Sequence, residues 1–96
     1  MTLDNEFKKQ TEKLVIETLN LYKNAGASPR IGDVWKCEHT GDFLCGFFVG
    51  EMVGSALSAF QVFHKRDPSS EEHMEIVEIV EKHSDEIVEF FIKFNS

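Results

Sequence analysis

Cysteine and basic residues are both scarce in this sequence. Its 96 residues include two cysteines, too few for a disulfide-stabilised scaffold. The opening residues, MTLDNEFKKQTEKL, lack the apolar run of a secretory signal, so we expect a cytoplasmic protein. Lysine and arginine number 10 against 17 acidic residues, which gives a net charge of -7. That balance excludes a basic nucleic-acid-binding surface and disfavours binding to anionic lipids.

Proline is rare as well, with two copies, whereas phenylalanine is abundant, with nine. Hydrophobic residues make up 42% of the chain, which is enough for a core and argues against intrinsic disorder. Neither a repeat nor a low-complexity segment interrupts the sequence. We therefore expect residues 1–96 to form a single folded helical domain.

Apolar residues recur at helical spacing in three stretches, at about 3–24, 42–64 and 69–94. Gly26 and Pro29 suit the end of the first helix. Between the first two helices we expect a loop with one turn of helix.

Local sequence signals suggest where the later helices begin. Asp42 is the expected N-cap of the second helix, and Ser69 or Ser70 caps the third, after Pro68. Val34 and Trp35 are expected to be covered by the bundle. The fold class is thus all-α: a small three-helix bundle on a long antiparallel hairpin of the second and third helices.

The second helix is apolar at every angle around its axis. Between Phe43 and Phe63 the strongly polar residues are Glu51 and Gln61. The helix is long enough to span a bilayer, but a carboxylate in mid-span costs roughly 2.5–3.5 kcal/mol. The two amphipathic helices also need a partner for their apolar faces. A soluble, enclosed helix is therefore favoured over a membrane span.

Four small residues repeat every fourth position along this helix, namely Gly46, Gly50, Gly54 and Ser58. Such a row lets a second backbone approach closely. It could serve a contact within the chain, for example with the first helix, or the crossing of two copies. The second interpretation also covers surplus apolar surface, so we expect a homodimer.

Glu51 and His83 are both out of place among apolar residues. In an antiparallel hairpin Glu51 falls opposite roughly residues 82–85, so a hydrogen bond to His83 would explain both. The pair could be structural, an acid/base dyad, or part of a ligand pocket. Its apolar walls would be Phe47, Phe48, Met52, Phe90 and Phe91.

A weak metal pattern is formed by Cys37, His39 and Cys45, with spacing C-x-H-x5-C. These are ligands suited to zinc, but the spacing is not a standard zinc signature and a fourth ligand is missing nearby. The ordinary interpretation is a loop cysteine, a surface histidine and a small core cysteine.

No catalytic set and no cofactor can be assigned, so an enzyme is the least supported class. The sequence favours a small acidic interaction or regulatory protein that binds another macromolecule as a homodimer, with a basic protein as a possible partner. The alternative is a small-ligand or metal-binding sensor whose Phe-rich pocket surrounds Glu51 and His83.

Overall fold

The computed structural model describes residues 2–25 and 31–95, except for the side chains of residues 31 and 32. Within these residues there are five helices and no strand, which confirms the all-α class. The helices are α1 (Asn5–Ala25), α2 (Ile31–Trp35), α3 (Thr40–His64), α4 (Ser70–Glu81) and α5 (Ser84–Ile92). The expected end signals of the first helix, Gly26 and Pro29, lie outside the described residues.

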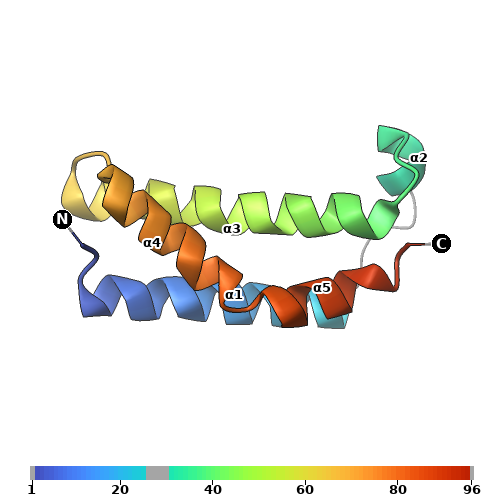
Figure 1. Ribbon diagram of the computed structural model, residues 1–96, viewed down its shortest axis with the longest axis horizontal. Helices are drawn as coiled ribbons and strands as arrows, with labels where there is room; N and C mark the ends of the chain where they lie inside the picture. Colours follow the sequence, from blue (N-terminus) through green and yellow to red (C-terminus); the bar gives the residue numbers. More distant parts are fainter. Residues whose placement is uncertain (1, 26–30, 96) are drawn as a thin grey trace.

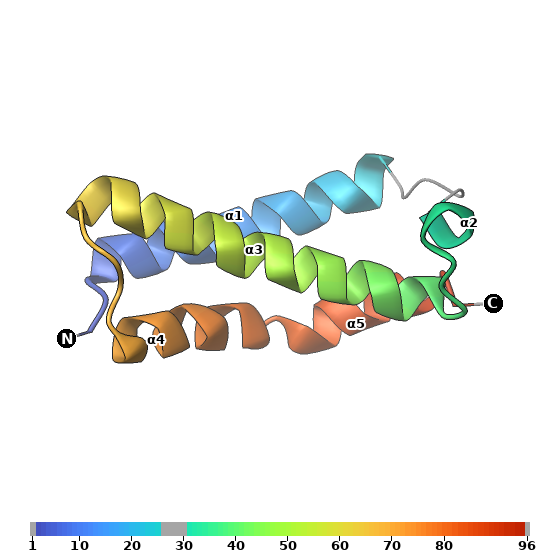
Figure 2. The ribbon, with the colours of Figure 1, turned by 90° about the horizontal axis from the view of Figure 1, so that it is seen from above.

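The molecule is elongated, with extents of 43 × 21 × 19 Å. α1 and α3 run along its length, and α4 crosses from the C-terminal end of α3 toward α1 before α5 continues along the same direction (Figure 1). Seen from above, α3 lies between α1 on one side and α4 and α5 on the other (Figure 2). The two chain ends lie at opposite ends of the molecule.

Two clusters of buried side chains fill the space between these helices. The first joins α1, α3, α4 and α5 and contains Leu19, Phe48, Met52, Ile87 and Phe91, among others. The second lies near the turn between α3 and α4 and contains Leu3, Phe7, Ala56, Phe60, Ile76 and Ile79. Each cluster buries one end of α3 against α1 and the C-terminal helices.

The α4 N-terminus is capped as expected, and its cap is tied to a buried ion pair. The Ser69 side chain accepts a hydrogen bond from the Glu72 backbone N–H, and the Glu72 side chain accepts one from the Ser69 backbone N–H, which forms a capping box. Arg66 donates two bonds to Glu72, at 2.8 and 2.9 Å. Glu72 is buried. Arg66 provides the opposite charge that a buried carboxylate needs, and both Arg66 and Ser69 donate hydrogen bonds to it.

The expected cap at Asp42 was wrong. α3 begins at Thr40, with His39 at the N-cap position and no side-chain cap bond. Asp42 lies inside the first turn, where its backbone N–H donates to Oδ1 of Asn95. A residue from the far end of the chain therefore satisfies one of the free donors of this helix terminus.

The single third helix expected at 69–94 is two helices, α4 and α5, because the α-helical hydrogen-bond pattern is interrupted at Lys82 and His83. There the His83 backbone N–H donates to the carbonyl of Val80, three residues back. The expectation for Val34 and Trp35 was also wrong: they are 55% and 66% exposed, on a short α2 that stands at one end of the molecule.

Candidate functional site

α3 presents four rows of residues, each made of every fourth position, because four residues make slightly more than one helical turn. One row is buried: Leu44, Phe48, Met52, Ala56 and Phe60. The second is partly buried against the core: Cys45, Val49, Val53 and Leu57. The other two, which we call the outer face, are Phe47, Glu51, Ser55, Ala59 and Phe63, and Gly46, Gly50, Gly54, Ser58 and Val62.

The outer face is open to solvent although it is largely apolar. A Cβ added at Gly46, Gly50 or Gly54 would meet no described atom of another part of the chain within 4 Å. Phe47, Val62 and Phe63 are 56%, 75% and 73% exposed. The glycines of this row therefore make no close contact with α1 in the part of the chain that the structure describes.

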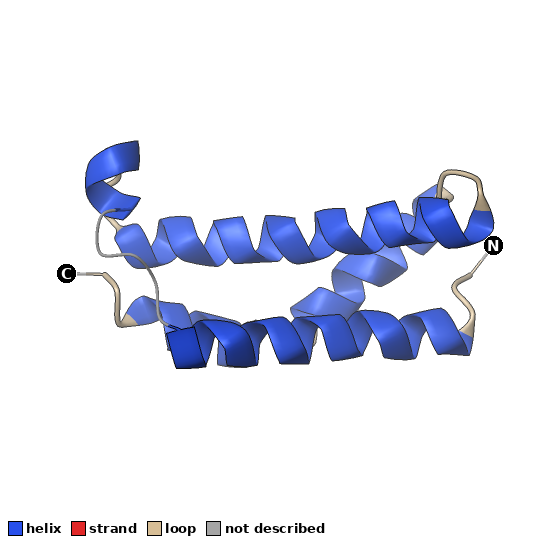
Figure 3. Cartoon of the chain, turned by 180° about the vertical axis from the view of Figure 1, so that it is seen from behind, coloured by secondary structure: helices blue, strands red, loops and turns tan. Residues whose placement is uncertain are grey.

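Beside the outer face, two adjoining hollows lie between α1 and the C-terminal half of α3. One of about 170 Å³ is lined by Asp4, Glu6, Phe7, Gln10, Phe63 and His64, and one of about 220 Å³ by Phe7, Gln10, Thr11, Leu14, Ala56, Ala59 and Phe63. They share Phe7, Gln10 and Phe63. Seen from behind, α1 and α3 run one below the other along the molecule (Figure 3). We call the two together the α1–α3 hollow.

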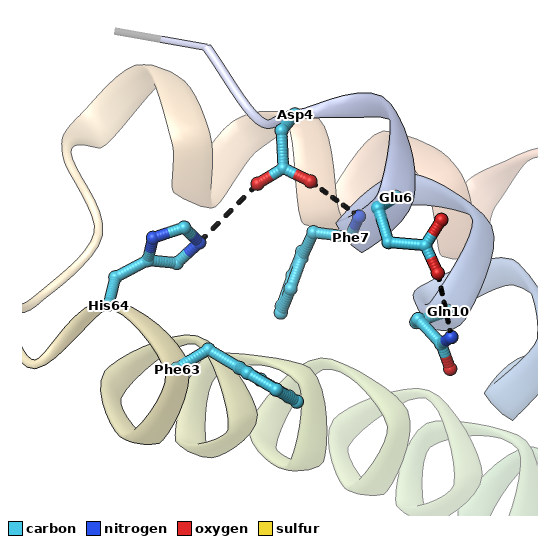
Figure 4. A pocket seen from close by; sticks show the side chains of 6 residues that line it. All are labelled: Asp4, Glu6, Phe7, Gln10, Phe63 and His64. Carbon is cyan, nitrogen blue, oxygen red and sulfur yellow. Dashed lines mark hydrogen bonds and ion pairs between the residues drawn. The ribbon is translucent and has the colours of Figure 1, made fainter.

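A polar pair closes one end of the α1–α3 hollow (Figure 4). Asp4 Oδ1 accepts the Phe7 backbone N–H at 2.8 Å, and Asp4 Oδ2 lies 3.5 Å from His64 Nε2. Phe7 points from α1 toward α3, and its ring contacts Phe60 edge to face. The walls are thus held by a helix-start hydrogen bond and by core packing.

Glu51 and His83 do not pair as the sequence suggested. Glu51 lies in the outer row next to the buried one, where its Oε1 accepts the Tyr22 hydroxyl at 3.1 Å. His83 Nε2 lies 3.3 Å from Oε1 of Glu12. Both partners belong to α1. The antiparallel register predicts how far along α3 Glu51 lies, but it does not predict toward which side of α3 its side chain points.

Burial and the Glu51 carboxylate together raise the pKa of Tyr22 above 10.0, burial contributing most. The ring of Tyr22 contacts Phe48 and Phe91 edge to face, at centroid distances of 5.3 and 5.6 Å. Tyr22 thus joins the outer face to the core.

The proposed Phe-rich walls are packed core. Phe48, Met52 and Phe91 are at most 2% exposed and Phe90 is 8% exposed, while Phe47 points out to solvent. Side chains that fill the interior against one another leave no space for a ligand there. Within the described residues the structure thus does not bring Glu51, His83 and these phenylalanines together around one pocket.

The weak metal pattern gains no support from the arrangement of its residues. Among the described residues no group of three His, Cys, Asp or Glu side chains could hold a metal ion. Cys37 and His39 lie between α2 and α3, whereas Cys45 packs against the core cluster from α3. Burial and the nearby Asp42 raise the pKa of the Cys45 thiol, which disfavours the thiolate that metals bind.

The surface of α4 and α5 is acidic. Exposed carboxylates are Glu71, Glu78, Glu81, Asp85, Glu86 and Glu89, with the exposed lysines Lys82 and Lys93 beside them. Lysines of α1 pair with two carboxylates of these helices, Lys8 with Glu75 at 3.3 Å and Lys23 with Glu86 at 2.8 Å. Lys23 holds the pKa of Glu86 below its usual range.

Sequence reasoning found the small-residue row but missed the α1–α3 hollow. Phe7 falls within the first predicted helix and Phe63 near the end of the second. Their spacing along each helix was visible in the sequence, but the crossing of α1 and α3 that creates the hollow was not.

No protein-family model matches this chain, and neither does any curated protein or solved structure. Among the described helices, α3 has the length and composition to cross a membrane. Its most apolar 18 residues have a mean hydropathy of 1.6, and 28% of that window is buried. The core helix of a soluble protein can meet the same two criteria, so they do not place α3 in a bilayer.

Proposed function

We propose that this protein is a small acidic interaction protein that self-associates through the outer face of α3 and binds another macromolecule as a homodimer. The observation that carries the proposal is the exposure of this face. Its glycines meet nothing, and its large side chains Phe47, Val62 and Phe63 are more than half exposed. Burying an apolar helix face of this kind against a second helix lowers the free energy of the system.

The charge distribution favours a second copy on this face. Glu51 is the one charged residue from Phe43 to Phe63, although the chain carries a net charge of -7. The outer face is therefore the part of an acidic molecule that another copy can approach with little repulsion. Glu51 also has a hydroxyl partner in Tyr22.

A basic macromolecule is the second partner that we propose, on the acidic surface of α4 and α5. The exposed carboxylates Glu78, Glu81, Asp85 and Glu89 spread along both helices. Charges of one sign on a surface raise the association rate of an oppositely charged partner, and salt weakens the effect. This surface lies apart from the outer face of α3, so one dimer could use both.

Sedimentation equilibrium over a range of protein concentrations tests the self-association. We expect a reversible dimer for the native chain and a monomer for Gly50→Lys, because a lysine there would bury its charge in the interface. The matched control is Val88→Lys on α5, where Val88 is 49% exposed. It should dimerise like the native chain. A native protein that stays monomeric at every concentration would refute the proposal.

Lipid vesicles provide the second arm of that test. The proposal expects the protein to stay in solution when neutral and anionic vesicles are floated through a density gradient. Flotation of the protein together with the vesicles, abolished by Gly50→Lys, would assign the outer face to a bilayer and overturn self-association.

A lysine-rich helical peptide tests the acidic surface. Its association rate with the native protein should fall steeply as salt is raised, and the triple variant Glu78→Gln, Glu81→Gln, Glu89→Gln should bind it more weakly. Because these residues lie away from the outer face, the variant should still dimerise. Salt-independent binding, or equal binding by the variant, would contradict a basic partner at this surface.

A further inference from the structure

The outer face of α3 carries a projecting aromatic side chain near one end and a hollow near the other. Phe47, 56% exposed, lies toward the N-terminal end. The α1–α3 hollow opens beside Phe63, toward the C-terminal end, and has volumes of about 170 and 220 Å³ in its two parts. No side chain of the described residues fills this hollow. Its walls, which include Phe7, Leu14 and Ala59, are mostly apolar.

The two features are placed symmetrically along α3. In one row, Phe47 lies eight residues before Ser55 and Phe63 eight residues after it. In the adjacent row, Gly46 and Val62 lie eight residues on either side of Gly54. At 1.5 Å per residue each feature is about 12 Å from the same central point. A two-fold axis at that point would bring the projection of each copy to the hollow of the other copy.

We propose that two copies pair antiparallel about a two-fold axis at Gly54 and Ser55, with Phe47 of each copy in the α1–α3 hollow of the other. This inference rests on the proposed function. A two-fold axis perpendicular to a pair of antiparallel helices places each row against its own reversed copy. Phe47 then meets the hollow beside Phe63 of the partner subunit, and Val62 lies over the partner's Gly46.

The small residues allow this arrangement because they let the two α3 backbones approach closely. Among the described residues, no atom outside the helix's own neighbouring backbone lies within 4 Å of a Cβ built on Gly50 or Gly54. With the backbones close, a side chain as long as Phe47 can reach past the partner's α3 surface toward its α1.

Glu51 favours the antiparallel orientation over the parallel one. In a parallel pair the two Glu51 carboxylates would lie at the same level of an apolar contact, one on each side of it. In the antiparallel pair Glu51 lies near Ser58 and Ala59 of the partner subunit, and the two carboxylates are about 10 Å apart along the helices. The Ser58 hydroxyl can donate to a carboxylate, so the orientation replaces a repulsion with a hydrogen bond.

Cysteine cross-linking at two neighbouring serines tests the axis. In a Cys37→Ser, Cys45→Ala background, Ser55→Cys places the thiols of the two copies next to the axis, where mild oxidation should form a disulfide-linked dimer. Ser58→Cys is the matched control, because its two positions lie about 10 Å apart along the helices. That separation exceeds the roughly 7 Å between Cα atoms that a disulfide can bridge.

Sedimentation of the same samples before oxidation separates the two proposals. A monomer at every concentration would refute the proposed function and with it this inference. A dimer that cross-links at Ser58→Cys, or fails to cross-link at Ser55→Cys, would leave self-association standing and overturn the antiparallel axis. Cross-linking at Ser55→Cys alone supports both.

Alanine substitution tests the aromatic contact itself. Phe47→Ala removes the contact twice, once from each copy of the symmetric dimer, and should weaken dimerisation roughly a hundred-fold or more. The matched control is Ile92→Ala, which shortens another side chain, 58% exposed, on α5. It should leave the dissociation constant unchanged. Equal dissociation constants for the two variants would overturn the placement of Phe47 in the partner's hollow.

Discussion

Asn95 and Asp42, 53 residues apart in the sequence, exchange two hydrogen bonds. The Asp42 backbone N–H donates to Asn95 Oδ1, and Asn95 Nδ2 donates to Asp42 Oδ1, each at 3.1 Å. The first turn of α3 is thereby capped by the segment that follows α5. One consequence is a close approach of two backbones at Gly41, beside Asp42.

Gly41→Ala should destabilise the protein. The added Cβ would collide with the carbonyl oxygen of Phe91 and lie 2.6 Å from Asn95 Oδ1. Overpacking of this kind costs about 1–3 kcal/mol. We expect the free energy of unfolding, measured in urea, to fall by that order despite the better helix propensity of alanine.

Gly54→Ala is the matched control for Gly41→Ala. Its Cβ would meet nothing within 4 Å, so the gain in helix propensity of about 0.5–1 kcal/mol should appear as added stability. Both variants are compared in dilute solution, where any dimer has dissociated. Equal effects of the two substitutions would show that the Phe91 and Asn95 contact does not restrict Gly41.

Glu72 should make folding stability depend on acid pH. Hydrogen bonds from Arg66 and Ser69 lower its pKa from 4.5 to about 2. Because the folded pKa is the lower one, the stabilisation is complete above about pH 4.5 and is lost as the pH falls toward 2. Urea unfolding of the native chain and of Glu72→Gln at several pH values measures this.

The advantage of the native chain over Glu72→Gln should be largest at neutral pH and shrink between pH 4.5 and 2. Glu78→Gln, which removes an exposed carboxylate from the same helix, is the control for the loss of one negative charge. A constant difference between the native chain and Glu72→Gln would contradict the lowered pKa.

Tyr22 reports on Glu51 directly, because it is the single tyrosine of the chain. A near-ultraviolet titration of tyrosinate should give a pKa above 10.0 in the native protein. Glu51→Gln removes the negative charge and should lower this pKa, while burial keeps it above 10.0. Glu12→Gln, on α1 beside His83, is the control; an equal effect of both variants would exclude a specific Tyr22–Glu51 bond.

Phe48 and Phe47 are adjacent in the sequence but should differ sharply in their effect on protomer stability. Phe48 is 0% exposed, so Phe48→Ala should cost about 3–5 kcal/mol. Phe47→Ala should change the stability of the dilute monomer by less than about 0.5 kcal/mol, because its side chain lies in solvent. Thermal and urea unfolding of both variants check this, and a large loss for Phe47→Ala would place that side chain in the core.

The features that could be predicted from the sequence are those that depend on local interactions. The all-α class follows from apolar periodicity, and the α4 start follows from Ser69 and Glu72, which form the capping box within one turn. The row of Gly46, Gly50, Gly54 and Ser58 needs only the helical repeat. Each of these features depends on residues close in the chain.

Tertiary structure decided the rest. The pairing of Asp42 with Asn95, the placement of Glu51 with Tyr22, and the break at Lys82 and His83 depend on how helices far apart in sequence are rotated and crossed. Hydrophobic periodicity states which side of a helix is apolar, but a helix that is apolar all round, such as α3, gives no such signal. Only packing against α1, α4 and α5 decided which rows of α3 are buried and which face remains open.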